Sequence, residues 1–160
     1  DKEQDLVLML EKSSGPDAAN SYYSLLDTLA PYPISTIDAA LLIVDPQRSF
    51  TEGVWMQSIG EGAENDVIPI VIAFNNCADV LKKIGNCAEV MFTRCPFPPE
   101  SYDWDQRLTG IIDSKQLYFI KPGNSVLFPP LNGFKEWMGH CIEHGRNTLV
   151  IGGCTLNSWE

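Results

Sequence analysis

The sequence predicts a three-layer α/β/α fold with a mostly parallel, Rossmann-like sheet. Four apolar runs recur along the chain, at residues 39–45, 88–93, 117–121 and 148–152. A continuous apolar run is typical of a parallel strand that is buried on both faces, whereas a half-exposed strand alternates apolar and polar residues. Segments with helical patterns separate these runs. Strands that alternate with helices indicate βαβ units with helices on both faces of the sheet.

The first half of the predicted domain contains one strand–helix–strand unit. AALLIVD, residues 39–45, is the first strand. Residues 66–84 form a helix that is stopped by Gly85, and Pro69 falls within its first turn, where proline is tolerated. AEVMFT, residues 88–93, is the second strand.

The second half continues the same alternation. A proline-rich loop over residues 95–101 leads to a short helical stretch near residues 104–112, and LYFIK, residues 117–121, is the third strand. FKEWMGHCIEH, residues 134–144, is a helix that a glycine ends, and TLVIG, residues 148–152, is the fourth strand.

The chain length of 160 residues is that of one domain. We expect residues 1–36 to be an N-terminal extension with a short helix at residues 18–29, and residues 37–160 to be the main domain. A fourth buried strand needs a helix to cover it, and the few residues after 153 are too short to supply one. We therefore expect the domain to be incomplete at its C-terminal end, or else to be completed by a partner such as a second copy in a homo-oligomer.

The composition excludes several classes of partner. Hydrophobic residues make up 44% and charged residues 20% of the chain, which is typical of a soluble globular protein. The formal net charge of −10 disfavours nucleic acid and anionic membranes, because like charges repel. No apolar run approaches the ~20 residues that span a bilayer. The five cysteines are odd in number and contain no C-x-x-C pair, which favours reduced thiols in the cytoplasm over disulfides or a zinc site.

Two histidines, His140 and His144, have the i, i+4 spacing that can hold a metal on a helix. They lack the neighbouring glutamate of an H-E-x-x-H motif. A solvated helix face is the better interpretation, and we expect neither a metal nor another cofactor.

Three polar features fall at the carboxyl ends of predicted strands, where open parallel sheets bind ligands. Asp45 ends the first strand, Lys121 ends the third, and small polar residues follow Gly153 after the fourth. A carboxylate accepts a proton from a thiol, an ammonium group lowers the thiol pKa, and backbone amides at a helix start hold an oxyanion. We expect Asp45 and Lys121 to lie within direct or water-bridged hydrogen-bond reach of each other, facing the loop after Gly153.

These motifs resemble those of the isochorismatase-like superfamily, also called the cysteine hydrolases. Its members begin with D-x-Q-x-x-F, matched here by Asp45, Gln47 and Phe50, and carry K-P after a middle strand, matched by Lys121 and Pro122. They finish with a strand that runs into G-x-x-T-x-x-C-V or G-C-T-T-x-x-C-V. The resemblance covers the whole predicted main domain. It implies a hydrolase of a small carbonyl compound, with Asp45 and Lys121 in a catalytic triad and with Gln47 and Phe50 in the substrate pocket.

The third member of the triad depends on how the last motif is aligned. If the G-C-T sequence that begins at Gly153 matches the second form of the motif, the nucleophile position is Trp159. This register keeps more identities and is preferred. The alternative register, anchored one glycine earlier, assigns the position to Ser158. Neither residue is a thiol, and Cys154 comes too early in the turn to be more than a fallback.

Three interpretations follow and stay open at this point. In the first, which we favour, the native protein cleaves an amide of a small molecule through a cysteine thioester, and the chain end is altered or incompletely represented. In the second, the protein resembles the branch that cleaves vinyl ethers by proton transfer from Asp45, which requires no thiol. In the third, it is an inactive relative that binds a partner. The branch that deaminates nicotinamide holds a metal with histidines after the second strand, and residues 92–104 contain none.

Overall fold

The computed structural model describes residues 35–53, 56, 63–96, 102–122, 126 and 132–153. The chain divides after Ser35 into two units, and the helices and strands described below belong to the second unit, Thr36–Glu160. The short helix expected at residues 18–29 and the residues after 153 lie outside the described part.

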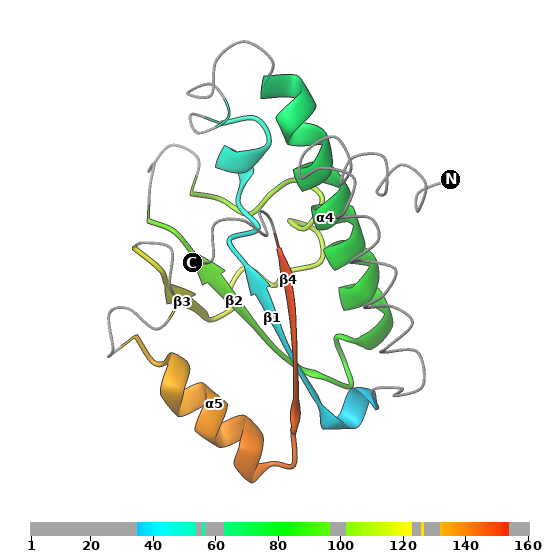
Figure 1. Cartoon of the computed structure of the whole chain (residues 1–160), viewed down its shortest axis with the longest axis vertical. Coiled ribbons are helices and arrows are strands. Elements are labelled where there is room, and N and C mark those ends of the chain that lie inside the picture. The colour runs from blue at the N-terminus through cyan, green and yellow to red at the C-terminus, as the bar shows by residue number, and fades with distance from the viewer. Residues whose placement is uncertain are drawn as a thin grey trace, which may run out of the picture. The chain divides into compact units, whose positions relative to one another are not determined.

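A parallel sheet forms the centre of the described unit (Figure 1). Its strands are β1 (Ala39–Val44), β2 (Glu89–Arg94), β3 (Tyr118–Ile120) and β4 (Thr148–Gly153), arranged in the order β3-β2-β1-β4. Each neighbouring pair is parallel. All six residues of β1 are buried, as its continuous apolar sequence predicts for a central strand.

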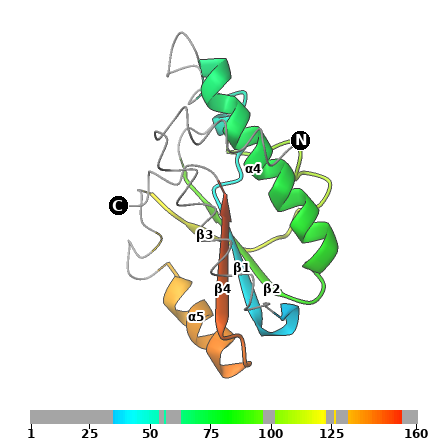
Figure 2. The ribbon, with the colours of Figure 1, turned by 45° about the vertical axis from the view of Figure 1, so that its right-hand side comes forward.

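Two helices cover opposite faces of this sheet (Figure 2). Successive strand residues point to opposite faces, so β1 contributes to two separate cores. Leu41 and Ile43 pack with Phe74 of α4 (Ala63–Ile84) on one face. On the other face, Leu42 packs with Trp137 of α5 (Phe134–Glu143). The predicted α/β fold with a parallel sheet is therefore confirmed.

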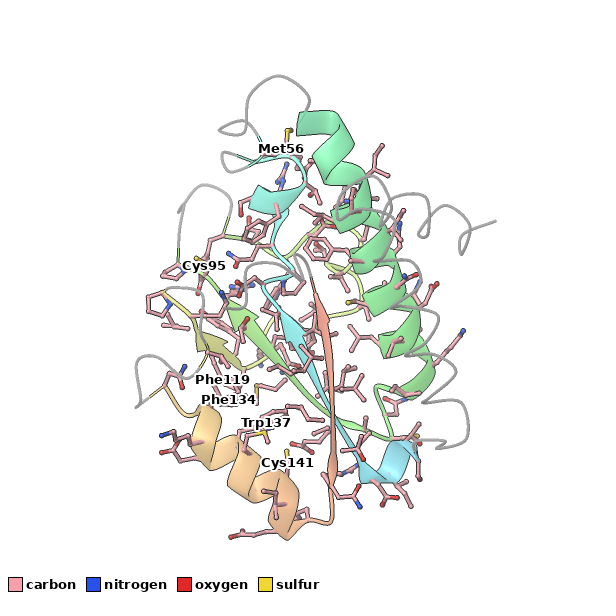
Figure 3. The ribbon with its side chains drawn as sticks, viewed as in Figure 1. Met56, Cys95, Phe119, Phe134, Trp137 and Cys141 are labelled. Carbon is pink, nitrogen blue, oxygen red and sulfur yellow. The ribbon has the colours of Figure 1, made fainter. Side chains whose placement is uncertain are left out.

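The core beneath α5 is largely aromatic. Figure 3 shows Phe119 of β3 beside Phe134, Trp137 and Cys141 of α5. The rings of Phe119 and Phe134 meet edge to face, with centroids 5.8 Å apart. Such pairs add stabilisation beyond the buried area. This cluster attaches β3 to α5, so the residue that follows β3 is held against a rigid support.

Residues 104–112 are not the helix that the sequence predicted. They form successive turns, in which the Asp105 carbonyl accepts the Leu108 N–H and the Leu108 carbonyl accepts the Ile112 N–H. The fully buried Asp105 carboxylate also accepts the Arg107 N–H at 3.0 Å. This bond resembles that of a helix N-cap, but the chain continues as turns and not as a regular helix. The turns still bury Leu108 and Ile112 in the core beneath α4.

The carboxyl ends of β1 and β4 mark the point where the chain changes its direction of travel across the sheet. From β1 the strands advance to β2 and β3, and α5 then carries the chain back to β4 on the other side of β1. Ligands of open α/β sheets bind in the crevice at such a switch point. At this end Gly153 lies opposite Val44, with φ +136°, and a Cβ added to Gly153 would lie 2.5 Å from the Val44 carbonyl oxygen.

In the described part of the chain, no helix has the length and apolar character needed to cross a membrane.

Gly153→Ala should lower the free energy of unfolding by about 2–3 kcal/mol, because alanine is strained at this φ and its Cβ would overlap β1. Gly139→Ala is the matched control: a Cβ at this position in α5 meets no atom within 4 Å, so the substitution should stabilise by up to about 1 kcal/mol. Urea unfolding followed by circular dichroism measures both changes. Equal stability of the two variants would show that β1 and β4 do not approach this closely.

Candidate active site

The side chains of Asp45 and Lys121 form a buried ion pair. Lys121 Nζ lies 2.8 Å from Asp45 Oδ2, and each side chain is 8% exposed. Asp45 directly follows β1 and Lys121 directly follows β3, with β2 between these strands. The Lys121 N–H donates to the Arg94 carbonyl at 2.8 Å, which extends the pairing of β2 with β3. The structure thus brings together the two residues that the strand-end argument placed at one edge of the sheet.

The backbone at Asp45 turns sharply out of the strand. Asp45 has φ +45°, the left-handed region that residues other than glycine rarely occupy. Its carbonyl accepts the Gln47 N–H at 2.7 Å, which closes a tight turn around Pro46. This turn directs the Asp45 side chain to the end of the sheet rather than to one of its faces.

Thr93 contacts both the backbone and the side chain of Asp45. Its hydroxyl oxygen accepts the Asp45 N–H at 3.0 Å and donates to Asp45 Oδ1 at 2.5 Å. Thr93 is fully buried near the end of β2. The sequence analysis did not identify Thr93 as a site residue. Thr93 ends the predicted second strand just as Asp45 ends the first, and this shared position was a signal that could have identified it. A buried hydroxyl needs a polar partner.

Gln47 and Phe50 both contact other parts of the protein: Gln47 binds the backbone of Cys95, and Phe50 packs against the core beneath α4. Gln47 is fully buried, its Nε2 donates to the Cys95 carbonyl at 2.8 Å, and its Oε1 accepts the Cys95 N–H at 2.7 Å. Phe50 is half-buried and packs against the core beneath α4. These contacts connect the loop after β1 to the end of β2, where Figure 3 places Cys95. The expected place of Gln47 and Phe50 in a substrate pocket stays a prediction.

A groove of about 360 Å³ lies beside this loop. It is lined by Arg48, Glu52, Arg94, Asp103, Trp104, Gln106 and Thr109, and it includes neither Asp45 nor Lys121. Positive and negative side chains balance within it, and Arg48 already pairs with Glu52 at 2.5 Å. The Arg94 guanidinium stacks over the Trp104 ring at 3.6 Å. The groove therefore carries no clear preference for a charged ligand.

The candidate nucleophile positions lie outside the described residues. Trp159, Ser158 and Cys154 follow Gly153, which is paired with the residue before Asp45. The chain that leads to these positions therefore starts next to the ion pair.

Another thiol near this end of the sheet, Cys77 of α4, is unsuited to catalysis. Burial raises the pKa of Cys77 to about 11, which the backbone of Gly153 offsets only in part. A thiol acts as a nucleophile only in its ionised form.

The described residues contain no cluster of three or more His, Cys, Asp or Glu side chains that could hold a metal ion. His140 of α5 and His144, the residue that caps its C-terminal end, stack with ring centroids 4.1 Å apart, and both are exposed.

Removing either member of the ion pair should leave an uncompensated charge in the interior. Asp45→Asn and Lys121→Met should each cost about 3–5 kcal/mol of unfolding free energy, because a buried charge without its partner is strongly destabilising. The double variant should cost less than the sum of the two by about 1–3 kcal/mol. Denaturant unfolding of the four proteins measures this coupling, and strictly additive losses would contradict direct pairing.

The cysteines should differ widely in reactivity. With a pKa of about 11, on the order of one Cys77 thiol in a thousand is ionised at pH 8, whereas Cys87 is exposed to solvent. Brief treatment with iodoacetamide at pH 8 should therefore modify Cys87 and leave Cys77 intact, as read by peptide mass spectrometry. Rapid modification of Cys77 in the folded protein would contradict the packing of α4 on β4.

Comparison with known proteins assigns no family to this chain: no protein-family model matches it, and no curated protein sequence matches it.

Proposed function

We propose that this chain has the fold and the acid–base pair of an isochorismatase-like hydrolase that acts on the C–N bond of a small amide. The observation that carries the proposal is the buried ion pair of Asp45 and Lys121 at the carboxyl edge of the sheet. Its Asp45 member follows β1 at the switch point, where Gly153 lies opposite Val44. The proposed nucleophile is a cysteine thiol at the position of Trp159. Tryptophan has no nucleophilic atom, so the acyl-transfer step depends on cysteine at this position.

The proposed reaction proceeds through a thioester. The Asp45 carboxylate accepts the thiol proton, and the sulfur attacks the amide carbonyl to form a tetrahedral intermediate. The C–N bond breaks as Asp45 returns the proton to the leaving nitrogen, so that ammonia or an amine departs. Asp45 then accepts a proton from water, whose oxygen attacks the thioester. The C–S bond then breaks, Asp45 returns this proton to the sulfur, and the carboxylic acid is released with the thiol regenerated.

Lys121 contributes a fixed positive charge to each of these steps. Its ammonium group orients Asp45 and stabilises a thiolate, and both effects are larger where water is excluded. Burial of the ion pair thus favours a role in chemistry over that of a surface salt bridge.

The contacts of Asp45 favour a proton acceptor over a proton donor. One carboxylate oxygen faces the Lys121 ammonium, and the other accepts the Thr93 hydroxyl proton. Both partners are hydrogen-bond donors, which stabilise an ionised carboxylate. Vinyl-ether cleavage would instead require Asp45 to begin as the protonated acid.

Trp159→Cys tests the proposal directly. Its thiol should react with iodoacetamide with a midpoint about 1–2 pH units below the ordinary ~8.5, because Lys121 stabilises the thiolate. Peptide mass spectrometry between pH 5 and 9 separates this thiol from the other cysteines. Adding Lys121→Met should return the midpoint to about 8.5. Trp159→Ser, which has no thiol there, gives the background labelling.

Activity measurements distinguish the remaining interpretations. Trp159→Cys should release ammonia from a panel of small primary amides, and adding Asp45→Asn should abolish the release. An ordinary thiol that is unaffected by Lys121→Met would contradict the proposal. Vinyl-ether cleavage by the unsubstituted chain, lost in Asp45→Asn, would replace the thioester mechanism with proton donation.

A further inference from the structure

Two side chains hold the Asp45 carboxylate in place: one belongs to β2 and the other directly follows β3. Lys121 after β3 binds Oδ2 at 2.8 Å, while Thr93 of β2 binds Oδ1 at 2.5 Å. A carboxylate has about four lone-pair positions, so these two contacts fix its plane and leave positions for a substrate or nucleophile proton. An ammonium group binds as a point charge, so Lys121 alone orients the carboxylate only in part. The hydroxyl supplies the second contact that completes this orientation.

The Thr93 hydroxyl has only one arrangement that satisfies both of its contacts. A hydroxyl has one proton to donate and accepts through its lone pairs. Because the oxygen accepts the Asp45 N–H at 3.0 Å, its own proton is available for Asp45 Oδ1. The χ1 angle of a β-branched residue is restricted, and Thr93 is fully buried, so the hydroxyl has little freedom to move.

The backbone of Asp45 needs this support. At φ +45° a residue with a side chain is strained relative to a right-handed conformation. Thr93 holds the amide of this strained residue and its carboxylate at the same time, so relaxation of the backbone would break both bonds.

We propose that Thr93 is the positioning residue of the site, which locks the left-handed backbone of Asp45 and fixes the orientation of its carboxylate. This inference rests on the proposed function for its catalytic meaning, but the positioning is measurable without any reaction. Thr93 acts through Asp45 and contacts no reacting atom.

A matched control exists elsewhere in the fold. The Thr51 hydroxyl donates to Oδ2 of the fully buried Asp105 at 2.5 Å, so Thr51→Val removes a second buried threonine–aspartate bond. Thr93→Val and Thr51→Val change the same chemical groups. They differ in that the Thr93 hydroxyl also accepts the backbone N–H of its aspartate, whereas the Thr51 hydroxyl lies 3.3 Å from the Arg48 carbonyl.

The experiment measures hydrogen exchange of the Asp45 amide by NMR, under conditions where the variants have equal stability. Thr93→Val should speed this exchange at least tenfold relative to Thr51→Val, because the Asp45 N–H loses its acceptor. Thr93→Ser, which keeps the hydroxyl, should stay within about threefold of the parent protein. Equal exchange in the two valine variants would overturn the proposal.

A measurement on the unsubstituted protein covers the case in which Thr93→Val does not fold. The Thr93 hydroxyl proton should give a slowly exchanging resonance with a cross-peak to the Asp45 amide, since it is buried and donated. An exposed, rapidly exchanging hydroxyl would overturn the proposal on its own.

Thiol labelling in the Trp159→Cys background separates this inference from the proposed function. If both hold, Thr93→Val should raise the alkylation midpoint of the thiol at position 159, whereas Thr93→Ser and Thr51→Val should not. If Asp45 exchange depends on Thr93 while the thiol is ordinary in every variant, the positioning role stands and the hydrolase proposal fails.

Discussion

The burial of one ion pair constrains the arrangement of the whole sheet. Asp45 and Lys121 extend from strands that are not neighbours, so they meet only if β1, β2 and β3 end at the same level. Desolvation offsets much of the attraction between two buried charges, so such a pair contributes more to specificity than to stability. A one-residue slip of β2 would turn Thr93 to the opposite face and leave Asp45 Oδ1 without its donor. A sheet with this wrong register would therefore be less stable, because one oxygen of the Asp45 carboxylate would lack its hydrogen-bond donor.

The apolar cores on both faces of the sheet contribute to the burial of this ion pair. β1 supplies side chains to the cores beneath α4 and α5, and these cores exclude water from both sides of the strand that carries Asp45. The aromatic contacts of Phe119 with α5 hold β3, and hence Lys121, in the same way. The buried polar contacts of Asp45 at the end of the sheet thus depend on apolar packing along the strands.

Much of this arrangement was predictable from local sequence. Continuous apolar runs located the strands within one or two residues, because parallel strands are buried on both faces. The strand-end rule placed Asp45 near Lys121, since parallel strands share their carboxyl edge. The helix expected at residues 104–112 was wrong. Leu108 and Ile112 have helical spacing, but the segment forms successive turns around the Asp105 and Leu108 carbonyls. Thr93 escaped notice because its role depends on strand register, which joins residues 48 positions apart.

The hydrogen bonds between Gln47 and Cys95 determine which part of the loop after β2 can vary in sequence. Gln47 recognises only the backbone N–H and carbonyl of Cys95, so the bonds form whatever side chain occupies position 95. The loop after β2 therefore has a fixed attachment point beside the site and a replaceable side chain at that point. Mutations at position 95 can therefore change the side chain at this point of the loop without disturbing the frame that holds Asp45.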